Sequence, residues 1–141
     1  MKLTPDIPTP SAILEAALYV DDLEAAEQFY GEILGLDQIQ RVPDRHVFYR
    51  VGGSVLLLFN PDQTEQQPSN SDLPVPPHGA RGPGHVCLVL TRDEIMAMRK
   101  HLLDWNIPID AEFDWPSGAR SLYVRDPAGN SVEFAESHLW T

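Results

Sequence analysis

The sequence repeats itself at a distance of seventy residues. A short apolar stretch that begins at Glu15 runs into a helical pattern, and the same arrangement returns from His85. A second similarity closes each half, where residues 54–57 resemble residues 131–134. Repetition of this kind predicts two copies of one structural unit that bury a common core. Equivalent positions in the two halves should therefore have equivalent surroundings.

Four strand positions stand out in this repeat because three of them carry side chains that can bind a metal ion. Glu15 and His85 are equivalent at the start of each half, and the similarity near the end of each half matches Leu56 with Glu133. If the halves curl one sheet around a shared cavity, these four positions meet there. We therefore expect a site with three potential metal ligands and one leucine.

The same order of elements is predicted in both halves, a strand, a helix and then three strands. The first half has predicted elements at 11–20, 23–34, 36–42, 46–51 and 54–60. The second half has them at 84–90, 93–105, 107–113, 120–125 and 131–136. Asp21 and Asp22 are placed to cap the first helix, and Gly35 to end it.

These elements predict an α+β fold in which two tandem β-α-β-β-β modules form a curved mixed sheet around a cavity. The modules span about 11–60 and 84–137 of a single domain, residues 1–141. The stretch 61–83 between them is rich in Pro, Gln, Ser and Asn and has almost no apolar periodicity. We interpret it as a linker or a lid over the cavity mouth.

Composition excludes several classes of function. The net charge of −11 disfavours binding to nucleic acid or to an anionic membrane, which leaves small molecules as the expected partners. The sequence has no apolar run of membrane-spanning length and no apolar signal segment, so a soluble, cytoplasmic protein is expected. Cys87 is the only cysteine, which excludes an intrachain disulfide and a cysteine-based zinc cluster.

The chain resembles the vicinal oxygen chelate superfamily, which contains glyoxalases, extradiol dioxygenases, fosfomycin-modifying enzymes and bleomycin-resistance proteins. The resemblance covers nearly the whole chain and rests on three segments, residues 18–36, 82–85 and 122–133. It implies the paired-module fold, a divalent metal such as Mn, Fe, Ni, Co or Zn, and a homodimer. It also implies metal ligands on the first and last strands of each module, which here gives Glu15, His85 and Glu133, with Leu56 in place of a fourth ligand.

One imidazole and two carboxylates are a suitable ligand set for these ions, and three protein ligands leave coordination positions open for a substrate. Glu15 could also serve as a general base.

Each residue has a simpler interpretation: the two glutamates could face solvent, and His85 could be a hydrogen-bonded core histidine. His78, on the lid, could approach the cavity, although a solvated loop histidine is the simpler interpretation, and His46 is interpreted as a surface residue.

Substrate-binding residues are harder to identify in a chain with only ten basic residues. Arg120 and Arg125 could each hold a carboxylate or phosphonate, or could be solvated cations that offset nearby acids. Tyr123 is the aromatic residue that we expect to line the cavity. The thiol of Cys87 is expected on the same strand face as His85, where we interpret it as a small buried core residue.

These residues and the resemblance lead to two alternative hypotheses for the function. The first is a metal-dependent enzyme of the glyoxalase and dioxygenase superfamily, which acts on a small substrate that chelates the metal through neighbouring oxygens. Lyase, isomerase or transferase chemistry fits Glu15 better than ring cleavage. The alternative is a metal-free protein that binds a drug or metabolite, as bleomycin-resistance proteins do.

Overall fold

The computed structural model describes residues 6–141, which form two four-stranded mixed sheets and a small number of helices. The first module contains β1 (Glu15–Tyr19), α1 (Leu23–Glu27), η1 (Gln28–Ile33), β2 (Asp37–Val42), β3 (His46–Val51) and β4 (Ser54–Phe59). The short helix α2 (Pro61–Thr64) follows. The second module contains β5 (His85–Val89), α3 (Arg92–Asp104), β6 (Ala111–Asp114), β7 (Arg120–Arg125) and β8 (Ser131–Ala135), and the chain closes with the 3-10 helix η2 (Ser137–Trp140).

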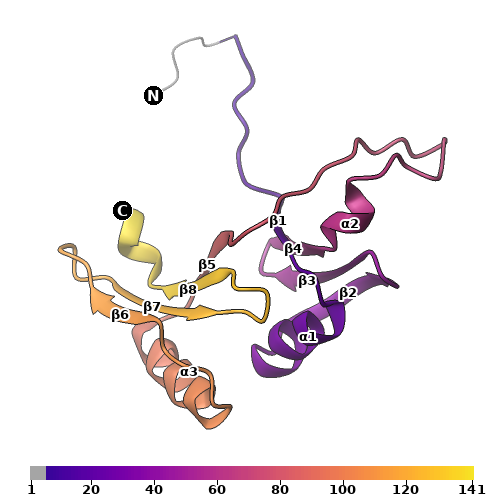
Figure 1. The fold of residues 1–141 in the computed structure, drawn as a ribbon. Coiled ribbons are helices and arrows are strands. Elements are labelled where there is room, and N and C mark those ends of the chain that lie inside the picture. Colours follow the sequence, from indigo (N-terminus) through magenta and orange to yellow (C-terminus); the bar gives the residue numbers. More distant parts are fainter. Residues whose placement is uncertain (1–5) are drawn as a thin grey trace.

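The two sheets have the same topology. Their strand orders are β1-β4-β3-β2 and β5-β8-β7-β6, and in each sheet the first strand lies at an edge, parallel to the last strand of its module. Figure 1 shows α1 and α3 on the same side of the molecule, beneath the two sheets. The α+β fold with two β-α-β-β-β modules is therefore confirmed. No helix within residues 6–141 is long and apolar enough to cross a membrane.

Local sequence signals explain where the helices begin. The Asp22 carboxylate accepts a hydrogen bond from the Ala25 backbone N–H at 3.0 Å and caps α1. Thr91 and Glu94 form a reciprocal capping box at the start of α3. The predicted first helix is α-helical only in its first part and continues as the π-helix η1 up to Gly35, whose φ of 74° suits a glycine.

The strand register corrects one position of the predicted repeat. Glu15 pairs with Val55 in the first sheet, and His85 pairs with Ser131 in the second. The equivalent of Glu133 is therefore Leu57, and the match with Leu56 was wrong by one residue. Because side chains alternate along a strand, Leu56 faces the hydrophobic core instead. The residue at the fourth position is therefore still a leucine, Leu57 instead of Leu56.

A buried polar junction joins the two modules. The Tyr30 hydroxyl donates to the Asp126 carboxylate at 2.7 Å, across a sequence separation of 96 residues. Asp126 also accepts from the backbone and side chain of Asn130, whose amide donates to the Tyr19 carbonyl at 3.0 Å. The amide oxygen of Asn130 accepts from the Gly84 backbone N–H at 2.7 Å, which ties down the end of the segment between the modules. Burial and the Asp126 charge raise the pKa of Tyr30, so its hydroxyl stays a donor.

We expect Tyr30→Phe to lower the free energy of unfolding by about 2 kcal/mol, because a buried carboxylate loses one of its donors. Tyr49→Phe is the matched control, since Tyr49 is equally buried but its hydroxyl reaches Gln38 only at 3.5 Å. Urea denaturation of both variants measures the difference. Equal losses would show that the Tyr30–Asp126 hydrogen bond has no special weight.

Candidate functional site

The structure brings His85 and Glu133 together on one face of the second sheet. His85 lies on β5 and Glu133 on β8, and the imidazole Nε2 is 3.2 Å from the carboxylate Oε1. The two side chains differ in exposure, because that of His85 is 50% exposed and that of Glu133 only 6%. The pair therefore has a buried carboxylate behind an imidazole that is open to solvent.

A chain of hydrogen bonds orients the buried carboxylate. The Ser121 hydroxyl donates to Glu133 Oε2 at 2.5 Å, and the Trp115 indole N–H donates to the Ser121 oxygen at 2.7 Å. Ser121 lies on β7, the strand that pairs with β8, two residues from Tyr123, which is paired with Glu133, and is fully buried. Since Oε2 is occupied in this way, Oε1 is left to face His85.

The hydrogen bonds of His85 favour the form of imidazole that binds metals. Its Nδ1 is 3.1 Å from the Ser131 carbonyl oxygen, which can only accept, so this contact requires an N–H at Nδ1. In the neutral ring Nε2 then carries a lone pair, which faces the oxygen lone pairs of Glu133. Two facing lone pairs at this distance need a cation between them, either a proton or a metal ion.

Tyr123 and Cys87 share the face of His85 and Glu133. The Tyr123 ring stacks on the His85 ring with 6.2 Å between centroids, and its place in a cavity wall stays a prediction. Partial burial and the Glu133 carboxylate raise the pKa of Tyr123 and raise that of Cys87 to about 12. As a residue Cys87 is exposed, contrary to our expectation of a buried core thiol, although its thiol is partly desolvated beside Glu133. With its raised pKa the thiol stays protonated at neutral pH and is a poor nucleophile.

Glu15 lies in a different place, in an open cavity of about 1010 Å³ in the first module. We call this the first-module cavity. The strands β1 to β4, Arg45 in the turn between β2 and β3, and the segment 63–78 line it. His85 instead lines a groove of about 600 Å³ between β1, β4 and β5. Within residues 6–141 of one chain, no three His, Cys, Asp or Glu side chains gather in a way that could hold a metal ion. The structure thus pairs His85 with Glu133 and leaves Glu15 apart from them.

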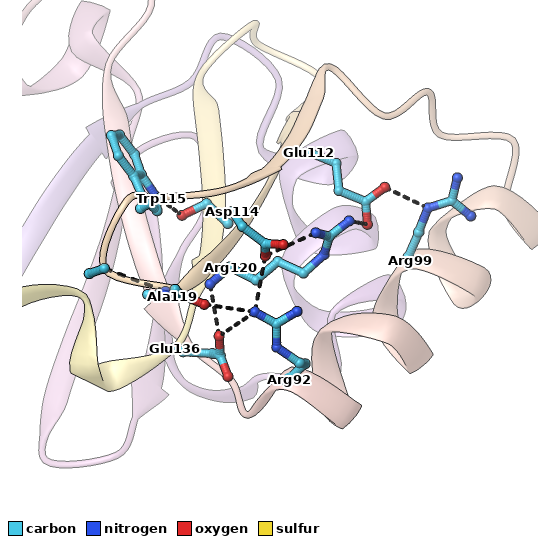
Figure 2. A network of polar contacts seen from close by, with 11 residues as sticks. Arg92, Arg99, Glu112, Asp114, Trp115, Ala119, Arg120 and Glu136 are labelled. Atoms are coloured by element: carbon cyan, nitrogen blue, oxygen red, sulfur yellow. Dashed lines mark hydrogen bonds and ion pairs between the residues drawn. The ribbon is translucent and has the colours of Figure 1, made fainter.

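Arg120 belongs to a network of ion pairs on the second module (Figure 2). Its guanidinium contacts Glu112 and Asp114, each at 3.1 Å, and its backbone N–H donates to Glu136 at 2.8 Å. Arg92 also pairs with Asp114 in this network. A role for Arg120 in substrate binding stays a prediction, and a substrate would have to compete with two carboxylates for its guanidinium. Arg125 pairs with Asp110.

Two histidines of the first-module cavity are less exposed to solvent than the sequence indicated. His46 is only 5% exposed, which corrects its interpretation as a surface residue, and its ring stacks on Phe48 at 4.0 Å. His78 is anchored rather than solvated, because its Nδ1 pairs with the Tyr19 hydroxyl at 2.8 Å and its ring packs on Phe59. The alternation of β3 could have indicated that His46 shares a face with Phe48. No local signal places His78 against β4.

Comparison with known proteins shows what the sequence and the fold are similar to. A family model described as the Glyoxalase/Bleomycin resistance protein/Dioxygenase superfamily matches residues 12–134. The crystal structure of a lactoylglutathione lyase from Agrobacterium tumefaciens is 42% identical and has a TM-score of 0.89. That similarity covers 94% of this chain and 98% of the lyase chain.

More distant solved structures share the fold alone. A glyoxalase/bleomycin resistance protein/dioxygenase from Nocardioides is 24% identical with a TM-score of 0.70, over 93% of this chain and 86% of its own. A protein of the same description from Alicyclobacillus acidocaldarius is 18% identical with a TM-score of 0.63, over 92% of this chain and 94% of its own. None of the curated protein sequences matches the chain.

The buried histidine of the first-module cavity should make stability depend on pH. Burial, helped by the Arg45 charge, lowers the pKa of His46 from 6.5 to about 4. The unfolded chain therefore binds a proton more tightly than the folded one, and stability is lost as the pH falls from about 6.5 to about 4. We expect the wild type to lose up to about 2 kcal/mol more than His46→Gln across this range.

Urea denaturation at several pH values measures this difference, because the other titrating groups cancel between the two proteins. Parallel stability curves for the wild type and His46→Gln would contradict the prediction.

Proposed function

The chain belongs to the Glyoxalase/Bleomycin resistance protein/Dioxygenase superfamily, and on that basis we propose that it is a metal-dependent enzyme with lyase or isomerase chemistry. Its substrate would be a small molecule that chelates a divalent ion through two neighbouring oxygens. The observation that carries the proposal is the convergence of His85 Nε2 and Glu133 Oε1, which lie 3.2 Å apart while Ser131 holds the other nitrogen of the imidazole.

These residues suit a divalent ion such as Mn, Fe, Ni, Co or Zn. An imidazole nitrogen and a carboxylate oxygen converge, each fixed from behind by a hydrogen bond, as is usual for metal ligands. The exposed side of His85 leaves room for a substrate. When bound, the ion would stabilise negative charge that develops on a substrate oxygen.

The protein's own groups would have separate roles in the reaction. Ser121 and Trp115 would keep the Glu133 carboxylate in a single orientation. Tyr123 would form a wall of the site beside His85. Glu15 would be the third ligand and, in the reaction, the base that removes a substrate proton.

Glu15 can meet the other two ligands if two copies of the chain form a homodimer. β1 and β5 are edge strands whose site-bearing residues are exposed, so the face of one module is open to a module of a second chain. In a two-fold dimer Glu15 of one chain would then join His85 and Glu133 of the other, twice over. This arrangement is part of the proposal, because one chain alone does not assemble the three groups.

We expect His85→Ala and Glu133→Gln to abolish stoichiometric metal binding. Ser121→Ala should weaken metal affinity about tenfold to a hundredfold, because it removes the support of a ligand and not the ligand itself. Glu24→Gln, a change to an exposed glutamate on α1, is the control. Metal content by mass spectrometry after reloading with Mn, Fe, Ni and Zn measures the effects. Unchanged metal binding in Glu133→Gln would refute the proposed site.

Mixing two inactive variants tests whether sites are shared between chains. Glu15→Gln and Glu133→Gln homodimers should each lack complete sites. In a mixed dimer one site would carry both substitutions and the other neither. About half of the dimers in an equal mixture are mixed, so the mixture should recover about a quarter of the wild-type metal capacity and activity. If each site lies within one chain, mixing restores nothing. The absence of metal binding in the wild type itself would favour the alternative, a metal-free binding protein.

A further inference from the structure

The first-module cavity contains an arginine that lacks a carboxylate partner. Arg45 lies in the turn between β2 and β3, is half-buried and lines the cavity. The remaining basic side chains described in residues 6–141 form ion pairs with Asp or Glu, apart from Arg50. Arg50 is exposed and does not line the cavity. In a chain with a net charge of −11, a half-buried cation without an acid is unexpected.

Neighbouring side chains hold the Arg45 guanidinium in place without neutralising it. Its Nη1 donates to His46 Nδ1 at 2.6 Å, and His46 Nε2 in turn donates to the Gln40 side-chain oxygen at 2.7 Å. The guanidinium also lies 5.5 Å from the centroid of the Phe59 ring. These contacts leave most of its N–H groups without a side-chain acceptor among residues 6–141. A planar fork of free donors matches the two oxygens of a carboxylate.

Aromatic rings form the wall of the cavity beside this cation. The His46 and Phe48 rings are stacked with only 9° between their planes, and the Phe59 ring meets Phe48 edge-on at 5.4 Å. Apolar side chains of β4 and of the segment 63–78 extend the lining, among them Val55, Leu57, Leu73 and Val75. Such a wall favours a flat, apolar ligand body, because aromatic pairs gain energy beyond the area that they bury.

The charges around the cavity limit the ligand to one negative charge. Arg45 can offset one carboxylate, whereas Glu15 lines the same cavity and the protein as a whole is strongly acidic. A dianion such as a phosphate monoester would therefore meet repulsion that a single arginine does not offset. A neutral ligand would displace water from the Arg45 donors without supplying the charged acceptor that a carboxylate provides.

We propose that the first-module cavity binds a monoanionic aromatic carboxylate, with its carboxylate on Arg45 and its ring against Phe48 and Phe59. The segment 63–78 would close over the ligand, since His78 is already tied to Tyr19 and to the Thr64 carbonyl. This inference goes beyond the proposed function, because binding at Arg45 requires neither a metal ion nor turnover.

The test uses the full-length protein treated with a chelator, so that no metal site contributes. Phenylpropanoate is titrated by calorimetry beside phenylpropanamide, which lacks the charge, and propanoate, which lacks the ring. We expect the aromatic acid to bind at least about tenfold more tightly than either control ligand. Amide chemical shifts in NMR spectra should change around Phe48, Phe59 and His78.

Three variants identify the residue responsible. Arg45→Met should abolish the preference for the acid over the amide, whereas Arg45→Lys should keep part of it, because lysine retains the charge without the planar fork. Arg50→Met, which removes the other unpaired arginine from outside the cavity, should bind like the wild type. Circular dichroism shows whether each variant is folded, and the comparison of acid with amide on the wild type needs no variant.

Equal affinity of the wild type for acid and amide would overturn the proposal, and so would the absence of binding at millimolar ligand. Wild-type preference in a folded Arg45→Met protein would also overturn it. Each of these results leaves metal uptake by His85 and Glu133 untouched, so failure here is distinguishable from failure of the proposed enzyme function.

Discussion

The arrangement of the two modules depends on the buried hydrogen bond between the Tyr30 hydroxyl and the Asp126 carboxylate. Asp126 is only 4% exposed, so its oxygens need protein donors, and Tyr30 and Asn130 supply them from both halves of the chain. A single cluster of apolar side chains surrounds this junction and draws from both modules. The two modules therefore share one core on their helical side. The opposite sheet faces, with Glu15 and His85, remain open.

The open faces of the two sheets have the same backbone geometry and opposite chemistry. At equivalent positions the first sheet has Leu57 and Phe48 where the second has Glu133 and Tyr123. At these positions the first face is apolar, although Glu15 and Arg45 line the same cavity, and the second face has a buried carboxylate. A duplicated fold can thus offer a surface for an apolar substrate body and another for a metal ion. A dimer that brings the two kinds of face together would join binding and chemistry in one site.

Much of the fold was predictable because it follows from local patterns. Three predictions were confirmed: the order of elements along each module, the Asp22 cap and the glycine that ends the first helix. The register of β4 was wrong by one residue because the turns before β4 and β8 hold the chain differently, and a slip of one residue moves a side chain to the other face. His46 was misplaced because its burial comes from Gln40, Phe48 and Phe59, on three different strands.

By itself the sequence determined the duplicated architecture and the identity of the ligand-capable residues, since periodicity and residue chemistry are local properties. Only the tertiary structure decided which of those residues meet. It placed His85 against Glu133, kept Glu15 in a separate cavity, and used Arg120 in an ion-pair network while it left Arg45 without an acid. These outcomes depend on strand register and on contacts across many residues of sequence, and no single segment of the chain contains that information.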